Sequence, residues 1–277
     1  MDTIIAKAAW GMNEPLEERF EKIANAGYGA YESPPPADIR PEVFRDLLDG
    51  YGLKYIAQMH TDGDMGAASH AGSFRERLLR ALEWSPILVN CHTGRDGMPW
   101  EEQRRLFEDV LEAEREGGVR VAHETHRSRC AFTPWTTARL LKEFPDLALC
   151  ADFSHWVCVT ESFLDRYADD VELAIGRSVH IHGRVGYFHG PQVADPRAPE
   201  VAGELDVHES WWKRIYERRR ESGTGTFTFT PEFGPPGYMH VLPFTRQPVA
   251  DLWEVNDWIR GRAAAWVERL EAEGAKA

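Results

Sequence analysis

Histidine and carboxylate side chains recur in this sequence within, or just after, short apolar runs. The histidines placed in this way are His60, His92, His123, His126, His155, His180 and His182. Acidic residues occupy similar positions at Glu32, Glu124, Asp152 and Glu232. Carboxylates are rarely placed inside apolar segments without a partner, so this distribution predicts one shared polar site.

A site built from carboxylates and imidazoles favours divalent cations. Such ligands suit Mn²⁺, Mg²⁺, Co²⁺ or Zn²⁺, and the absence of thiolates argues against a structural zinc site. Alternation along a strand sorts the neighbouring candidates. Glu124 and His126 share one face, and His123 takes the other. His180 and His182 share a face, and we choose His182, nearer the strand end, as the ligand with His180 packed below it.

The apolar runs predict eight strands, each followed by an amphipathic helix. The predicted strands are residues 3–10, 28–33, 53–60, 87–92, 119–126, 147–153, 179–184 and 227–232. The predicted helices are residues 14–26, 41–49, 74–84, 100–116, 136–144, 161–175, 209–220 and 252–270. Near-continuous apolar strands that alternate with helices indicate a parallel sheet.

Eight such units predict the α/β class, as a single (β/α)₈ TIM barrel that forms one domain over residues 1–277. An open doubly wound sheet is the alternative, but no Gly-rich phosphate loop follows the first strand. Barrel enzymes carry their chemistry at the C-terminal ends of the strands, where the polar residues fall. The long connections 185–205 and 234–250 are also expected to carry function.

Composition excludes several classes of protein. The net charge of −13 and the pI near 5.3 argue against binding to nucleic acid or to an anionic membrane, because both need basic surfaces. No apolar stretch approaches a membrane span, and the N-terminus lacks the features of a signal peptide. The four cysteines have no metal-finger or CxxC spacing. We therefore expect reduced thiols and a cytoplasmic location.

Four segments resemble the xylose-isomerase-like TIM barrel superfamily of sugar isomerases and epimerases. They are HETHR (123–127), ADFSHW (151–156), VHIHGR (179–184) and TPEFG (230–234). The resemblance implies one divalent metal ion, with Mn²⁺ as the first choice, bound by Glu124, Asp152, His182 and Glu232. It also implies that His155 and Arg184 contact substrate oxygens. Glu124 and Glu232 would move a proton at the carbon beside a carbonyl that the metal polarises.

Other strand-end residues are candidates for the wall of a substrate pocket. His60, His92, His126 and Glu32 are expected to contact substrate, and Trp10 could form an apolar wall. Gly183 and Arg184 stand where family epimerases often carry an acidic residue. No Gly-rich loop appears, and no basic cluster lies at strands seven and eight beyond Arg184. This disfavours phosphorylated substrates.

The sequence therefore predicts a metal-dependent sugar isomerase or epimerase acting on a small sugar or cyclitol. A metal-dependent dehydratase or lyase acting on a keto-sugar is the alternative, because the same site serves both. An AP-endonuclease-type multi-zinc phosphodiesterase is disfavoured by the acidic charge. A non-catalytic sugar-binding barrel is disfavoured because all four ligands are present. Superfamily relatives often form dimers or tetramers, so a homo-oligomer is possible here.

Overall fold

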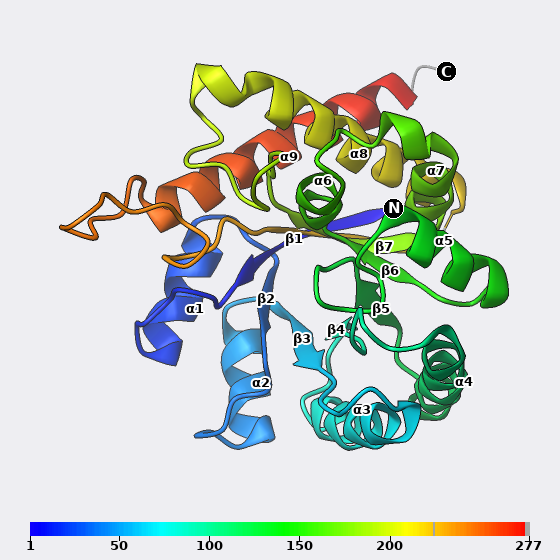
Figure 1. Cartoon of the computed structure of the whole chain (residues 1–277). Coiled ribbons are helices and arrows are strands. Elements are labelled where there is room, and N and C mark those ends of the chain that lie inside the picture. The colour runs from blue at the N-terminus through cyan, green and yellow to red at the C-terminus, as the bar shows by residue number, and fades with distance from the viewer. Residues whose placement is uncertain (224, 275–277) are drawn as a thin grey trace.

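Eight parallel strands close into a barrel in which each strand pairs with the next and β8 returns to β1 (Figure 1). The computed structural model describes residues 1–223 and 225–274. The strands are β1 (Asp2–Ala8), β2 (Ala30–Ser33), β3 (Lys54–His60), β4 (Leu88–His92), β5 (Val121–Glu124), β6 (Leu149–Ala151), β7 (Ser178–Gly183) and β8 (Thr226–Pro231). The predicted α/β barrel is confirmed.

Helices surround the barrel and cover its outer face (Figure 1). They are α1 (Leu16–Asn25), α2 (Pro41–Gly50), α3 (Ala67–Leu82), α4 (Trp100–Gly117), α5 (Pro134–Glu143), α6 (Ser154–Thr160), α7 (Ala168–Arg177), α8 (Ala202–Glu221) and α9 (Leu252–Gly274). Short 3₁₀ turns, η1 (Asp165–Tyr167) and η2 (Pro199–Val201), precede α7 and α8. None of the described helices is long and apolar enough to cross a membrane.

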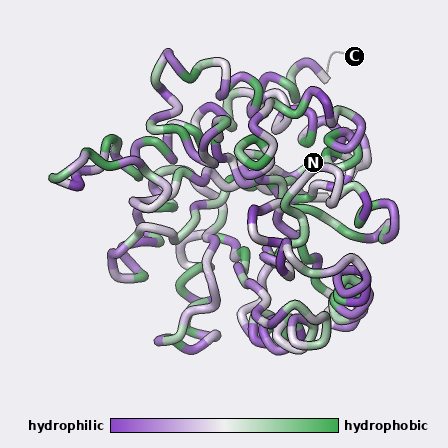
Figure 2. Tube along the Cα trace, viewed as in Figure 1, coloured by the Kyte–Doolittle hydropathy of each residue, from purple (hydrophilic) through white to green (hydrophobic). Residues whose placement is uncertain are grey.

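The helices are amphipathic, as the periodicity predicted. In α4 the buried apolar positions Leu106, Phe107, Val110 and Leu111 recur at helical spacing and face the strands. Figure 2 shows hydrophobic residues alternating with hydrophilic ones along the same helices. The main core therefore lies between the outer face of the barrel and the ring of helices.

Two helices begin seven residues earlier than the sequence predicted. Helix α3 begins at Ala67 rather than at residue 74, and α8 begins at Ala202 rather than at residue 209. The backbone N–H of Ala67 donates a hydrogen bond of 2.8 Å to Glu102 on α4. That contact caps α3 from a neighbouring helix, so local sequence patterns do not reveal it.

The helix predicted over residues 161–175 begins only at Ala168, as α7, and a short helix that was not predicted, α6, precedes it. Helix α6 follows β6 directly and ends where Glu161 adopts a left-handed φ of 47°. Leu164 adopts a second positive φ of 67° before η1 and α7 begin. Because α6 begins at Ser154, His155 lies in the first turn of a helix rather than in a loop.

The interior of the barrel changes from apolar to polar along the strands. A lower layer consists of Ala6, Ala30, Ile56, Leu88, Ala122 and Cys150, all buried. The residue two positions later in the sequence is polar in most cases, as at Glu32, Gln58, Asn90, Glu124 and Asp152. Side chains two residues apart point to the same face, so these polar groups lie directly above the apolar layer.

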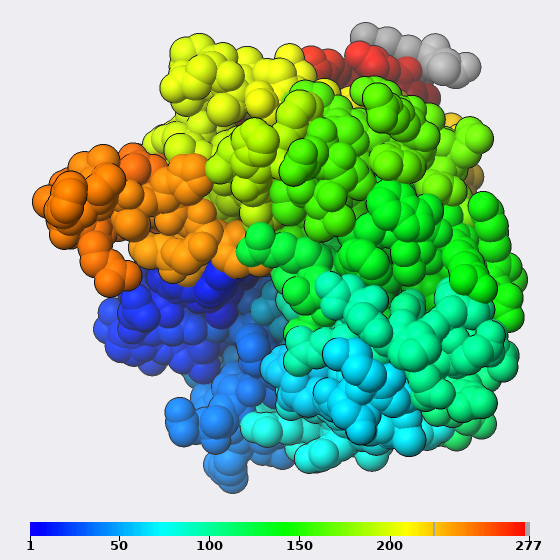
Figure 3. All heavy atoms as spheres, in the orientation of Figure 1, coloured from blue at the N-terminus to red at the C-terminus, as the bar shows by residue number. Residues whose placement is uncertain are grey.

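The connection between β8 and α9 projects from the body of the molecule, as the orange segment in Figure 3 shows. Phe244 at its tip is fully exposed, whereas Met239 and Phe233 near its base are buried. The base of the loop, and not its tip, therefore contributes to the barrel rim.

Gly183 is required by packing at the end of β7, between His182 and Arg184. A Cβ at this position would lie 2.3 Å from the Phe229 ring, which is itself fully buried. We expect Gly183→Ala to lower the free energy of unfolding by about 1–3 kcal/mol, since overpacking forces neighbours from their positions. Denaturant unfolding measures the change.

Gly203→Ala is the matched control, because Gly203 lies in α8 and a Cβ there meets no atom within 4 Å. It should leave stability unchanged or raise it by up to about 1 kcal/mol. Equal effects of the two substitutions would contradict the packing argument.

Candidate metal centre

Four polar side chains from neighbouring strands meet above the barrel interior. They are Glu124 at the end of β5, Asp152 after β6, His182 on β7 and Glu232 after β8. One ligand atom from each lies within 4.8 Å of the others, and all four residues are buried. The structure therefore brings together the four residues that the sequence analysis proposed as metal ligands.

The unsatisfied atoms of this cluster fit a divalent cation. Nδ1 of His182, Oε1 of Glu124 and Oε2 of Glu232 are buried and form no hydrogen bond within the described structure. His182 Nδ1 lies 2.8 Å from Glu232 Oε2, without the geometry of a hydrogen bond. Buried polar atoms are normally hydrogen-bonded, and one imidazole with three carboxylates is a suitable donor set for Mn²⁺, Mg²⁺, Co²⁺ or Zn²⁺.

Glu32 orients His182 from below. Its Oε1 lies 2.9 Å from Nε2 of His182, which leaves Nδ1 directed at the cluster. His180 and Thr230 also hydrogen-bond the Glu32 carboxylate. Burial alone would raise the pKa of Glu32, but His182 and His180 hold it well below its ordinary value. A carboxylate behind a ligating histidine fixes the tautomer and the ring orientation.

The sequence analysis expected Glu32 in the pocket wall, in contact with substrate. The structure places it under His182, buried and outside the lining of the cavity. Glu32 is the last inward-facing position of β2, one level below the rim.

Arg184 neutralises part of the carboxylate charge. Its Nε donates to Asp152 Oδ2 at 2.9 Å, and its terminal nitrogen lies 2.6 Å from Glu232 Oε2. The guanidinium packs over the rings of Tyr238 and Trp10, with its carbon 4.5 and 5.5 Å from their centroids. Burial opposes its charge, but Glu232 and Asp152 raise the pKa of Arg184 above its ordinary value. Arg184 is therefore a fixed cation.

Asp152 and Glu124 differ in their electrostatic surroundings. Burial raises the pKa of Asp152 to about 6, against the lowering effect of Arg184. For Glu124 burial would also raise the pKa, but His92 and His182 hold it well below the ordinary value. Asn90 and His92 each hydrogen-bond Oε2 of Glu124 at 2.7 Å. The same oxygen lies 3.4 Å from Nδ1 of His182, and Oε1 is left without a hydrogen bond in the described structure.

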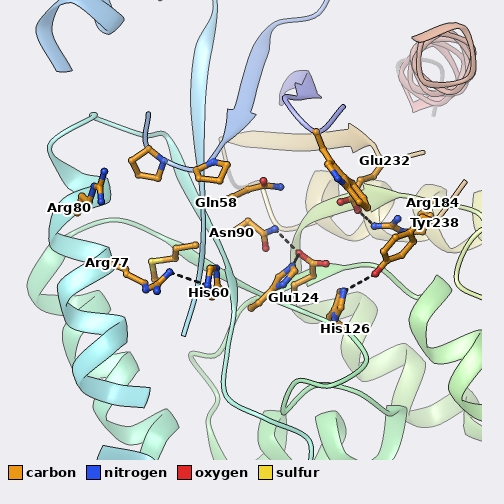
Figure 4. Close-up of a pocket in the computed structure, with 15 residues that line it drawn as sticks. Gln58, His60, Arg77, Arg80, Asn90, Glu124, His126, Arg184, Glu232 and Tyr238 are labelled. Atoms are coloured by element: carbon orange, nitrogen blue, oxygen red, sulfur yellow. Dashed lines mark hydrogen bonds and ion pairs between the residues drawn. The ribbon is translucent and has the colours of Figure 1, made fainter. Parts of the chain in front are cut away.

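A cavity of about 400 Å³ opens above the centre (Figure 4). Its lining comprises Trp10, Pro34, Pro35, Gln58, Met59, His60, Arg77, Arg80, Asn90, His92, Glu124, His126, Arg184, Glu232 and Tyr238. Seven of the residues proposed from sequence are among these, namely Trp10, His60, His92, Glu124, His126, Arg184 and Glu232. Asp152, His155, His182 and Glu32 lie deeper and do not line it.

Three histidine rings pack in a row beside Glu124. The ring centroids of His92 and His126 are 4.5 Å apart, and those of His126 and His155 are 3.8 Å apart. Burial lowers the pKa of His126 to about 4 and that of His155 well below the ordinary value. Both are therefore neutral near pH 7. His155 lies 3.5 Å from Asp152 Oδ2 and is covered by His126 and Tyr238.

Sequence reasoning missed five polar residues of the pocket: Arg77 and Arg80 on α3, and also Gln58, Asn90 and Tyr238. Asn90 stands two residues before His92 on the same strand face, so alternation could have found it. Gln58 likewise precedes His60 on β3 and hydrogen-bonds Glu32. Tyr238 lies in the connection between β8 and α9, where no periodicity marks it, and its hydroxyl is 3.3 Å from His126 Nε2.

The fold and this cluster define a (β/α)₈ barrel with a candidate metal centre at the C-terminal ends of its strands. The sequence pattern of the xylose isomerase-like TIM barrel family matches residues 20–234. The chain therefore belongs to this family, and the resemblance seen in the sequence is confirmed. No functionally curated protein matches the sequence.

Solved structures with the same fold differ in the activities that their descriptions state. An L-ribulose 3-epimerase aligns with a TM-score of 0.68 and 15% identity, covering 100% of this chain and 99% of its own. Endonuclease IV from Thermus thermophilus aligns at 0.59 and 17% identity, covering 96% and 99%. The probable 3-DHS dehydratase AsbF from Bacillus anthracis aligns at 0.58 and 13% identity, covering 86% and 95%. At these identities the likeness shows the fold alone.

Removing the charge of Glu32 tests its contact with His182. We expect Glu32→Gln to weaken metal binding by roughly 10–100-fold, the usual cost of losing the partner behind a ligating histidine. Competition with a chelator measures the dissociation constant for Mn²⁺. Glu42→Gln, on the first turn of α2, is the control and should leave the affinity unchanged. An unchanged affinity in Glu32→Gln would show that His182 needs no such partner.

Proposed function

We propose that this protein is a divalent-metal-dependent enzyme that isomerises or epimerises a small keto-sugar or cyclitol. One observation carries the proposal: Glu124, Asp152, His182 and Glu232 form a buried cluster in which an atom of each residue except Asp152 lacks a hydrogen bond, and the two glutamates also line the cavity. Family membership and the likeness to an L-ribulose 3-epimerase support this class of reaction.

The proposed cation would be held by Glu124, Asp152, His182 and Glu232, with Mn²⁺ as the first choice. When bound, it would polarise the substrate carbonyl. Arg184 supplies one fixed positive charge against the three carboxylates, so a divalent ion bound beside a neutral His182 would balance the charge of the site. The metal identity is part of the proposal.

Glu124 and Glu232 are proposed to move the proton. Both reach the cavity, and both belong to the same cluster of ligand atoms. One glutamate would take the proton from the carbon beside the carbonyl, and the other would return a proton to the opposite face or to the neighbouring carbon. Asn90 and His92 hold the Glu124 carboxylate, while Arg184 holds that of Glu232, so both bases are fixed before substrate binds.

Other pocket residues are proposed to bind substrate hydroxyls. His92 and His126 present imidazole edges beside Glu124, and His60 stands further along the wall. Trp10 and Tyr238, whose rings pack edge to face at 5.1 Å, provide an apolar wall at the side of Glu232. Rings of this kind commonly orient a small ligand in an otherwise polar pocket.

Elimination from a keto-sugar is the second candidate. The same proton abstraction begins it, and the fold is shared with a probable 3-DHS dehydratase. Multi-zinc phosphodiester hydrolysis has one feature in its favour, because His92, Glu124 and His126 form a second group of possible ligands that shares Glu124. The net charge of −13 disfavours a polyanionic substrate.

Proton exchange in D₂O tests the proposed function. The Mn²⁺-loaded protein is incubated with a panel of ketoses, and deuterium at the carbon beside the carbonyl is followed by NMR. We expect Glu124→Gln and Glu232→Gln each to slow exchange by roughly 10²–10⁴-fold, the usual contribution of a general base. A dehydrated product instead of exchanged ketose would select the elimination reaction.

Glu76→Gln is the matched control, because Glu76 is exposed on α3 and lies outside the cavity. It should exchange at the rate of the unaltered protein. Exchange that persists in both active-site variants would remove the glutamates from the mechanism.

A further inference from the structure

The cavity has a second charged end, away from the metal centre. Figure 4 shows Arg77 and Arg80 on α3 at one side of the pocket, with Glu232 and Arg184 at the other. The two arginines stand three residues apart, so they lie on the same helix face, and both line the cavity. Gln58, Asn90 and Glu124 lie between the two ends (Figure 4).

Arg80 has no partner in residues 1–223 or 225–274. Its side chain is exposed, and the guanidinium forms neither a hydrogen bond nor an ion pair with any residue that the structure describes. Most other arginines of α3 and α4 are paired: Arg75 with Glu112 and Glu116, and Arg104 with Glu101 and Glu108. An unpaired guanidinium at a pocket wall can accept an anion without first breaking an internal ion pair.

Arg77 is the second cationic side chain at this end of the cavity. It pairs with Asp62 and lies 3.2 Å from Nε2 of His60. Burial and the charge of Arg77 lower the pKa of His60 below its ordinary value. With Asp62 offsetting one arginine and His60 neutral, this end of the cavity keeps one net positive charge.

We propose that the α3 end of the cavity binds a terminal anionic group of the substrate, a phosphate monoester or a carboxylate, through Arg80 with Arg77 beside it. This inference rests on the proposed function and narrows the substrate class to acidic keto-sugars. The carbonyl end of such a substrate lies at Glu124 and Glu232, and the anion lies at the opposite end.

The position of these arginines explains why the sequence analysis disfavoured phosphorylated substrates. TIM barrels frequently bind phosphate at the loops after strands seven and eight, and the sequence offers no basic cluster there beyond Arg184. The structure shows that Arg184 is engaged by Asp152 and Glu232. The other cationic side chains that line the cavity, Arg77 and Arg80, come from α3. Arginines on a helix are ordinarily interpreted as part of its solvent-exposed face.

Binding measurements on matched ligand pairs test the proposal without turnover. Titration calorimetry compares D-ribulose 5-phosphate with D-ribulose, and 5-keto-D-gluconate with D-fructose, on the metal-loaded protein. We expect at least one charged ligand to bind about tenfold or more tightly than its neutral counterpart, as for a charge-assisted contact. The two charged ligands distinguish phosphate from carboxylate as the group recognised.

Arg80→Gln should remove most of that preference, and Arg80→Lys should restore part of it. Arg115→Gln is the control, because Arg115 is exposed on α4, has no ion pair in the described structure and lies outside the cavity. The Arg80 variants should retain the metal content of the unaltered protein, since Arg80 is not part of the cluster. Retained preference in Arg80→Gln would assign the anion to the metal instead and overturn the proposal.

Equal binding of charged and neutral ligands, or binding of neither, would also overturn it. These binding results do not decide the proposed function, which the proton-exchange experiment tests separately. Proton exchange on neutral ketoses can persist while the charge preference is absent, and an Arg80-dependent preference can persist while exchange is absent.

Discussion

The burial of three carboxylates around one imidazole is the constraint on which the rest of this structure depends. Glu124, Asp152 and Glu232 are each almost fully removed from water, and like charges this close repel strongly where the dielectric constant is low. Arg184 contacts two of them and offsets one negative charge, and a divalent cation would offset the other two. The centre is therefore an arrangement that would be costly without a cation.

The strands of the barrel contribute both apolar residues to its interior and polar residues to the site above it. The inward residues of the lower layer are small or apolar and fill the interior, and those one level higher are polar. Because the alternation period is two, Ala122 and Glu124 are neighbours on one face of β5. The same step from Ala30 to Glu32 on β2 supplies the group that orients His182. Stability and chemistry thus come from adjacent residues of the same strands.

Much of this organisation could be predicted from sequence because it is local. Apolar runs and helical periodicity define the strands and helices, and their ends mark the polar candidates. The family resemblance then selects Glu124, Asp152, His182 and Glu232 from these candidates as one group. Contacts between distant segments could not be predicted in this way. The cap that Glu102 provides for α3, the packing of Tyr238 on Arg184 and the position of Arg80 on the cavity wall all depend on tertiary structure. The sequence analysis expected the Glu32 side chain in the wall of the pocket, whereas in the structure it lies one layer deeper in the barrel. The residue types of a strand do not specify that depth.

Metal content per chain tests the central claim most directly. Inductively coupled plasma mass spectrometry is applied to the purified protein and to Glu232→Gln, with circular dichroism to verify that both are folded. The structure predicts about one Mn, Mg, Co or Zn per chain in the unaltered protein and a marked loss in the variant, because Glu232 supplies one of the four ligand positions. If neither protein retained metal after Mn²⁺ was supplied, the metal centre would be refuted and only the barrel fold would remain.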